Sequence, residues 1–159
     1  AVEKRVFHYQ FKPDGVYGLQ ENPALPAGSI GCRMGTLFAG ATEVNLDILG
    51  KSGHAAFPQD ANGAVVAAAS LIMQVQTINS RSIDPIQSGV FSIGKIEDGA
   101  NRNVIAGQAR IEGTIRGLNQ NMILTIDQRL KEICLGIEKS FGVEVKLDLK
   151  QGGHWPVEN

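Results

Sequence analysis

Three polar side chains in this sequence are of the kinds that bind or activate a substrate, namely His54, Asn103 and Arg116. An imidazole can exchange a proton near neutral pH, and a guanidinium can hold a carboxylate through two parallel hydrogen bonds. Each residue also has an ordinary structural explanation. His54 could satisfy a loop, Asn103 could suit a turn because asparagine tolerates a left-handed backbone, and Arg116 could be a solvated strand residue. The residue types alone leave both explanations open.

The segment around His54 has the composition of a shaped loop. Gly50 and Gly53 precede the histidine, Pro58 follows it, and an alanine-rich run begins soon afterwards. The chain has three histidines, which are scattered over separate segments, so no pair has the spacing that prepares a metal site. Residues 42–150 also contain no HExxH, phosphate-loop, GxSxG or CxxC pattern. The sequence therefore predicts no metal site in this chain.

Periodic segments define the elements that must position these residues. Strict alternation of apolar and polar residues predicts strands, and apolar residues three or four apart predict helices. The predicted elements are a strand at 42–50, a helix at about 60–79, strands at 88–96 and 108–117, a helix at 119–141 and a strand at 143–150. Asn119 is expected to cap the second helix, which should end before Gly142.

This order is β-α-β-β-α-β, which predicts an α+β, ferredoxin-like fold: a four-stranded antiparallel sheet with two helices on one face. The two strands at 88–96 and 108–117 are expected to form a hairpin, with the second and fourth strands of the sheet at its edges. His54 then lies in the loop after the first strand, and Arg116 closes the third strand.

The second strand and the first helix predict self-association. The strand carries Val90, Phe91 and Ile93, with Lys95 as its only charge, so its edge is poorly protected against pairing. The helix has an inward stripe formed by Val65, Ala68, Ala69, Ile72 and Val75, and further apolar residues lie beyond it, namely Ala64, Val66, Ala67, Leu71 and Met73. We expect a two-fold homodimer in which two such sheets join through these elements.

Composition narrows the functional class. The net charge is −1 with acidic and basic residues interleaved, so no basic surface is expected for nucleic acid. No apolar run approaches the roughly 20 residues that cross a membrane. Cys32 and Cys134 lie far apart, which favours free thiols in a cytoplasmic protein over a disulfide framework.

Three segments together closely resemble the dinuclear-metal amidohydrolases and peptidases of the aminoacylase and carboxypeptidase G superfamily. They are "GLQENPALPAGSIGCRMGTLFAG", "GKSGHAAFPQDANGAVVAAASL" and "SIGKIEDGANRNVIAGQARIEGTIRGL". The resemblance is nearest the branch of hippurate hydrolases, auxin-conjugate hydrolases and N-acetyldiaminopimelate deacetylases, and "SRSIDP" and "EGTIRGL" look most like the deacetylases.

The resemblance implies that this chain is the lid and dimerisation domain of an enzyme that hydrolyses N-acyl amino acids, with diaminopimelate deacetylation in lysine biosynthesis as the most specific expectation. It implies residues 1–38 as a catalytic-domain remnant and linker, 39–150 as the lid, and 151–159 as the return to the catalytic domain. His54 would stabilise the oxyanion in the partner subunit's active site, while Asn103 and Arg116 would bind substrate.

The resemblance also implies two divalent ions in the full-length family, zinc, manganese or cobalt, held by motifs outside these residues. The chain alone is therefore expected to be inactive. Gln20 stands where the family usually has a metal-ligand histidine, and a glutamine carbonyl is a poorer zinc ligand. The alternative is a non-enzymatic ferredoxin-like module that binds a small molecule or mediates assembly. Such a module should bind its ligand alone, whereas a lid should bind neither metal nor N-acyl amino acid usefully.

Overall fold

The computed structural model describes residues 21–32, 34–35 and 39–151. The expectation for Gln20 lies outside the described residues. In chain order the elements are β1 (Gly40–Leu49), β2 (Gly53–His54), the 3-10 turn η1 (Pro58–Asp60), α1 (Ala64–Thr77), the π-helical turn η2 (Ile78–Ser82), β3 (Gly89–Asp98), β4 (Val104–Ile105), β5 (Gln108–Gly117), α2 (Gln120–Phe141) and β6 (Glu144–Gln151).

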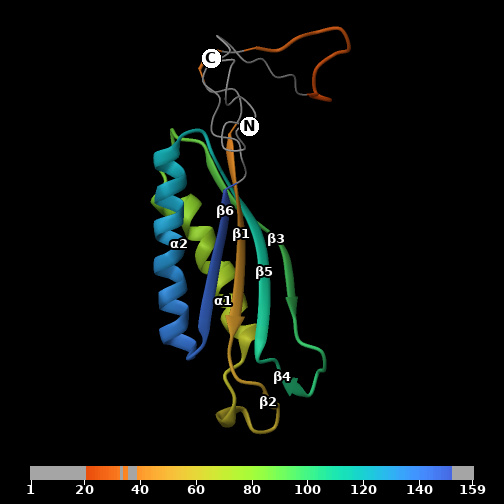
Figure 1. Cartoon of the computed structure of the whole chain (residues 1–159), viewed down its shortest axis with the longest axis vertical. Coiled ribbons are helices and arrows are strands. Elements are labelled where there is room, and N and C mark those ends of the chain that lie inside the picture. Colours follow the sequence, from red (N-terminus) through yellow and green to blue (C-terminus); the bar gives the residue numbers. More distant parts are fainter. Residues whose placement is uncertain (1–20, 33, 36–38, 152–159) are drawn as a thin grey trace, which may run out of the picture.

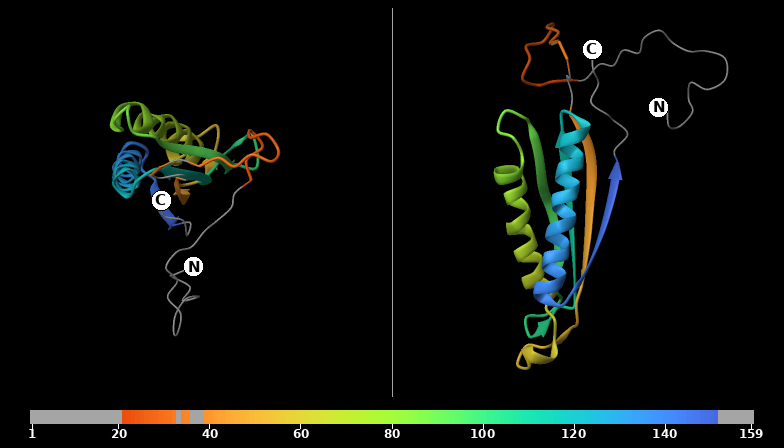
Figure 2. Two further views of the ribbon diagram at one scale, coloured as in Figure 1. Left: turned by 90° about the horizontal axis from the view of Figure 1, so that it is seen from above. Right: turned by 90° about the vertical axis from the view of Figure 1, so that its left-hand side faces the viewer.

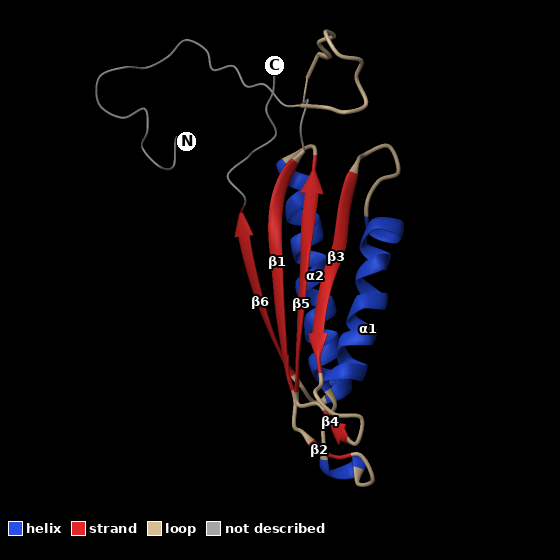
Figure 3. Cartoon of the chain, turned by 90° about the vertical axis from the view of Figure 1, so that its right-hand side faces the viewer, coloured by secondary structure: helices blue, strands red, loops and turns tan. Residues whose placement is uncertain are grey.

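The four long strands form one antiparallel sheet in the order β3-β5-β1-β6. Both long helices cover the same face of this sheet, as the end-on view in Figure 2 shows, and the opposite face is free of helices (Figure 3). The predicted α+β, ferredoxin-like arrangement is confirmed. The predicted hairpin of β3 and β5 is also present, and β3 and β6 are the two edges (Figure 1).

The core lies between the sheet and the two helices. On β1 the alternation predicted from sequence holds, because Val44, Leu46 and Ile48 are each at most 1% exposed and point toward the helices. The buried residues that α2 contributes are Met122, Ile126, Leu130, Ile133, Cys134 and Ile137. The apolar faces of the strands and helices therefore pack into one hydrophobic layer. This packing fixes the positions of the connecting loops.

Both ends of α2 are closed as predicted. The Asn119 side chain accepts a hydrogen bond from the Met122 N–H at 2.9 Å, and such a cap stabilises a helix by about 1 kcal/mol. At the other end Gly142 has φ +63°, a left-handed conformation that glycine adopts without steric cost.

The start and the orientation of α1 differ from the prediction. The α-helix begins at Ala64 rather than near residue 60, because the chain first makes the short turn η1. Its buried face comprises Ala64, Ala67, Ala68, Leu71 and Val75. Val65 and Ala69, predicted to face inward, are exposed. The small alanines face the sheet, which lets the helix approach it closely.

The prediction that Phe91 contributes to an exposed edge is wrong. Phe91 is 3% exposed and belongs to the core, while Ile93 is half-buried against it. Beyond Ile93 the register of β3 against β5 shifts, and Gly94 is the extra residue of a β-bulge. The apolar residues of this edge that remain exposed are Val90 and Ile96, each about half exposed.

The two cysteines are free thiols in different settings. Cys32 is exposed, whereas Cys134 is buried in α2. Burial raises the pKa of the Cys134 thiol to about 11. That thiol is therefore protonated near neutral pH and acts as an apolar core group.

Candidate functional site

His54 lies at one tip of the molecule, where two loops pair. The short strand β2 runs antiparallel to β4, with Gly53 opposite Ile105 and His54 opposite Val104. The Ala55 N–H donates to the Asn103 carbonyl oxygen at 3.1 Å. The structure therefore brings His54 and Asn103 together at this tip, at the lower end of Figure 1.

The β2–β4 pairing was missed in the sequence. Two-residue strands have no periodicity to detect, and the only available signal was the apolar pair Val104 and Ile105 after a run of turn residues. The close approach of the loops also explains two glycines. A Cβ on Gly53 would lie 2.7 Å from the Ala61 Cβ, and one on Gly107 would lie 2.6 Å from the Ser52 nitrogen.

The ring of His54 is held by its own loop. The Ala56 N–H donates to Nδ1 at 3.0 Å. In the neutral ring this leaves the proton on Nε2, so that nitrogen is a hydrogen-bond donor. The Phe57 ring meets the imidazole edge to face at a centroid distance of 5.8 Å. His54 itself is exposed, so its donor is available to a group from outside this fold.

The base of the His54 loop is closed by Lys51 and Asn62. Each backbone N–H of this pair donates to the other's carbonyl oxygen, at 3.0 and 2.9 Å. The Asn62 amide nitrogen also donates to the Gly142 carbonyl oxygen at 2.6 Å and, more weakly, to that of Phe141 at 3.4 Å. The loop is thereby attached to the C-terminal end of α2.

Arg116 lies at the opposite end of the sheet. It is exposed near the end of β5, opposite Ala41 of β1 and Val90 of β3. The first residue of β5, Gln108, lies near the His54 tip, and eight strand residues span about 26 Å. Within one chain, Arg116 and His54 therefore cannot contact the same small molecule.

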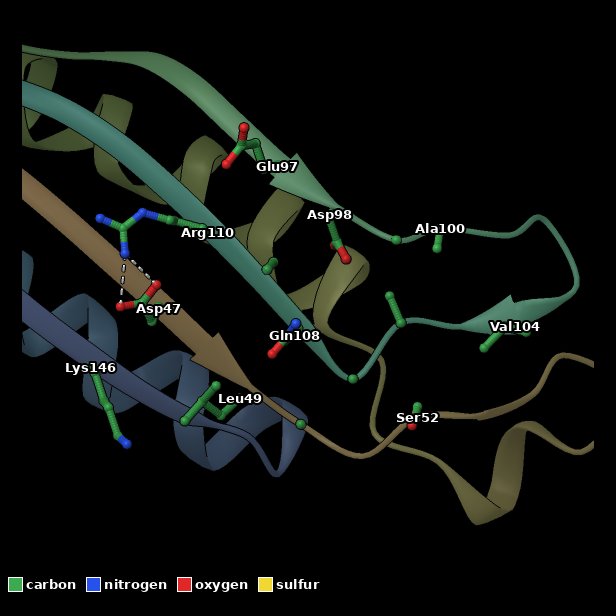
Figure 4. Close-up of a pocket in the computed structure, with 15 residues that line it drawn as sticks. Asp47, Leu49, Ser52, Glu97, Asp98, Ala100, Val104, Gln108, Arg110 and Lys146 are labelled. Atoms are coloured by element: carbon green, nitrogen blue, oxygen red, sulfur yellow. Dashed lines mark hydrogen bonds and ion pairs between the residues drawn. The ribbon is translucent and has the colours of Figure 1, made fainter.

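On the helix-free face, the end of the sheet nearest the tip holds an open hollow of about 910 Å³, whose lining includes Asp47, Gln108 and Arg110 (Figure 4). One side of it is formed by Arg110 and Asp47, and Arg110 binds Asp47 at 3.0 Å and Glu112 at 2.8 Å. The hydrogen bond from Arg110 lowers the pKa of Glu112. Each of these side chains is already held by an ion pair within the sheet, so we assign the hollow no catalytic role.

A metal site is not formed by the part of the chain that the structure describes. No three side chains of His, Cys, Asp or Glu gather there into a group that could hold an ion. Residues 21–32, 34–35 and 39–151 thus do not by themselves fit the two metal ions that the resemblance implies. Across the same residues, no helix has the length and apolar character to cross a membrane.

Comparisons with known proteins give a consistent result. A family model described as a peptidase dimerisation domain matches residues 38–138. The N-acetyldiaminopimelate deacetylase of Lactobacillus acidophilus is 70% identical over all 159 residues, and that of Limosilactobacillus reuteri is 68% identical. The chain spans 42% of the length of each of these relatives.

Solved structures show the same relationship. A putative aminohydrolase from methicillin-resistant Staphylococcus aureus is 32% identical, with a TM-score of 0.76 over 80% of this chain and 32% of that one. A Bacillus subtilis protein described as a dinuclear metal binding peptidase of the M20 family is 25% identical, with a TM-score of 0.61 over 82% of this chain and 31% of that one.

Proposed function

The chain belongs to the peptidase dimerisation domain family, and from this premise we propose that it is the lid and dimerisation segment of a metal-dependent amidohydrolase. The relatives at 70% and 68% identity make N-acetyldiaminopimelate deacetylation, a step of lysine biosynthesis, the best-supported activity of the parent enzyme. We place that enzyme in the cytoplasm, with its cysteines as free thiols. The observation that carries the proposal is the separation of His54 from Arg116 along one sheet.

The proposed domain boundaries follow from the ends of the sheet. Thr42 pairs with Gln151, so the first and last strands begin and end side by side, at the Arg116 end. We propose that residues 39–150 form an inserted lid and that residues 1–38 and 151–159 belong to a catalytic domain attached at this end. The two metal ions, zinc, manganese or cobalt, would be held in that domain.

This arrangement gives the proposed site residues different origins. Arg116 lies beside the connections to its own catalytic domain, whereas His54 and Asn103 lie about 26 Å further away at the tip. The tip therefore points away from the catalytic domain of its own chain. For His54 and Arg116 to act on one substrate, they must come from two subunits.

We propose that the dimer forms through β3 and α1. A groove between them is lined by Ile72, Gln76, Ile93, Gly94 and Ile96, among others. In the described residues β3 pairs with β5 on one side and with no strand on its outer side. A two-fold axis at this edge would pair β3 with its copy in antiparallel orientation. The tip of each subunit would then lie beside the Arg116 end of the other.

The roles follow from the chemistry of each side chain. The Nε2–H of His54 would donate to the amide carbonyl oxygen as that oxygen gains negative charge. Asn103, beside His54, would bind the substrate's polar groups. Arg116 would hold the substrate carboxylate through its guanidinium fork.

Kinetics of the parent enzyme can separate these roles. His54→Ala should lower kcat by a factor of about 10² to 10³, because an oxyanion donor acts in the transition state. Arg116→Ala should chiefly raise KM, because a carboxylate is present in the ground state as well. The reverse pattern would show that the roles are wrongly assigned.

Mixed dimers test the two-subunit origin of the site. A His54→Ala subunit paired with an Arg116→Ala subunit keeps one site in which both residues are native. Random mixing makes about half of the dimers mixed. At substrate concentrations well below KM, where each variant alone is nearly inactive, the mixture should therefore recover about a quarter of the wild-type activity. If both residues came from one subunit, mixing would recover nothing.

A further inference from the structure

We propose that Asn62 is a positioning residue for His54: its side-chain amide attaches the His54 loop to the end of α2. The inference rests on the proposed role of His54. Within the described residues, the side-chain hydrogen bonds that join the tip to α2 are both donated by Asn62. The acceptors are carbonyl oxygens at the C-terminal end of the helix, which have no partner within the helix itself.

The contact passes to His54 through a short chain of close neighbours. Asn62 forms a two-way backbone bridge with Lys51, and this bridge closes the loop at its base. Next to it, Gly53 lies so close to Ala61 that a Cβ would approach the alanine methyl to 2.7 Å. His54 is the residue after Gly53. A shift of Asn62 would therefore move the backbone that carries the imidazole.

The other hydrogen bonds of the tip do not replace this attachment. The β2–β4 pair and the bond from Ala55 to Asn103 connect the His54 loop to a second loop, so they hold the two loops to each other. The bonds from Gly50 to Gly107 and from Ala64 to Ala106 fix the points where the loop leaves β1 and enters α1. Among the described side chains of the tip, Asn62 is the one that adds side-chain hydrogen bonds to the end of a long helix.

The backbone at Gly142 leaves room for the Asn62 side-chain amide. Gly142 is in the left-handed region, and a Cβ there would lie 2.5 Å from the Asn62 Nδ2. The absence of that Cβ leaves room for the amide to reach the carbonyl oxygens. The pairing of Asn62 with Gly142 thus combines a donor with the space that it needs.

Two substitutions of Asn62 distinguish the effect of its hydrogen-bond donor from the effect of its side-chain shape. Asn62→Ala removes the amide, and Asn62→Asp keeps its shape but places a carboxylate against two carbonyl oxygens. Both should disturb His54, and Asn62→Asp at least as much as Asn62→Ala at neutral pH. Asn119→Ala is the matched control, because it removes a side-chain hydrogen bond at the opposite end of the same helix.

The first readout is the imidazole itself, measured by NMR on the 159-residue chain with nitrogen-labelled histidine. The native ring should show the proton on Nε2, as the bond from Ala56 to Nδ1 requires. Asn62→Ala and Asn62→Asp should give a mixture of tautomers or broadened signals, while Asn119→Ala leaves them unchanged. An unaltered His54 spectrum in both Asn62 variants would overturn the proposal.

The second readout is turnover of the parent enzyme. Asn62→Ala should lower kcat about tenfold, since displacement of a catalytic group by about 1 Å can cost up to 10²-fold. In the His54→Ala background the same substitution should have no further effect, because a positioning residue acts through the group that it positions. An equal loss in both backgrounds would show a general structural role instead.

The two readouts keep the hypotheses apart. If His54→Ala left kcat unchanged while Asn62→Ala altered the His54 spectrum, the proposed role of His54 would fail and the positioning would stand. If His54→Ala lowered kcat but Asn62→Ala changed neither the spectrum nor kcat, only the positioning would fail.

Discussion

Asp98 is a residue whose ionisation the fold opposes. It is the last residue of β3 and stands opposite the buried Ala109. Neither of its carboxylate oxygens has a hydrogen-bond partner in the described residues. Burial raises its pKa, and the Gly99 N–H offsets part of this effect without reaching the geometry of a full hydrogen bond.

The sign of the resulting pH dependence follows from linkage. The folded pKa of Asp98 lies above its ordinary value of 3.8, so the folded chain holds this proton more tightly than the unfolded chain. Stability is then lost as pH rises from about 3.8 through the folded pKa, and the loss is complete above it. Asp98→Asn should therefore raise Tm at pH 7 and give no gain below about pH 3.8.

Thermal unfolding between pH 3 and pH 8 would check this prediction. Asp148→Asn is a suitable control, because that carboxylate is 62% exposed on the edge strand β6. A gain for Asp98→Asn that did not change with pH would show that packing, rather than ionisation, is responsible.

The candidate site could be predicted residue by residue but not as an arrangement. The types of His54, Asn103 and Arg116 suggested roles, and those roles still await the kinetic tests. That two of them share a tip depends on β2 and β4, which are too short to leave a periodic signal. That Arg116 lies at the far end follows from the direction of β5, a consequence of the fold and not of local sequence.

At the level of elements, prediction succeeded where polar and apolar residues alternate clearly. The helix at 119–141 and the strand at 108–117 have such contrast and were assigned correctly, as were both ends of the helix. The run "AVVAAASLIM" in α1 has almost none, so its inward face could not be read from a period of 3.6 residues. In β3 the isolated Gly94 was the sign of a bulge. Because the bulge was overlooked, the prediction did not include the one-residue shift in register that precedes Ile96.

The groove between α1 and β3 gives a prediction for association. Ile96 is 49% exposed and lines this groove, so Ile96→Lys should place a charge in the proposed interface without disturbing the core. We expect the parent enzyme to shift from dimer toward monomer at micromolar concentration. Light scattering combined with size-exclusion chromatography would measure the shift.

Leu135→Lys provides the comparison for Ile96→Lys. Leu135 is 56% exposed on α2, away from the groove, and this substitution introduces the same charge. It should leave the dimer intact. Phe91→Lys is unsuitable as a test, because Phe91 is buried and its loss would unfold the domain. Equal behaviour of the two lysine variants would argue against this edge as the interface.

At the scale of the whole molecule, the first and last strands of the sheet begin and end side by side. The domain could therefore be removed from the parent enzyme without separating the flanking segments. Adjacent strands lie about 4.8 Å apart, so the chain enters and leaves through Thr42 and Gln151 at almost one point. Replacing residues 39–150 of the parent with a short glycine-rich linker should leave a catalytic domain that folds, binds its metal ions and is monomeric. It should not hydrolyse substrate, because it lacks His54, Asn103 and Arg116.

Metal analysis, light scattering and activity assays on this deletion variant would test the proposed boundaries. A variant that could not fold or bind metal would mean that the lid contributes to the catalytic domain's own structure. Retained activity would remove the proposed roles from all three residues.

The narrow connection at Thr42 and Gln151 also makes the sheet a lever with its pivot at one end. The ten-residue strands extend about 30 Å from that pivot. A rotation of about 10° at the connection would sweep the tip through about 5 Å, a distance comparable to the width of a substrate's acyl group. Small changes of angle at the pivot are thus amplified at His54, so substitutions at the connection would alter catalysis from a distance.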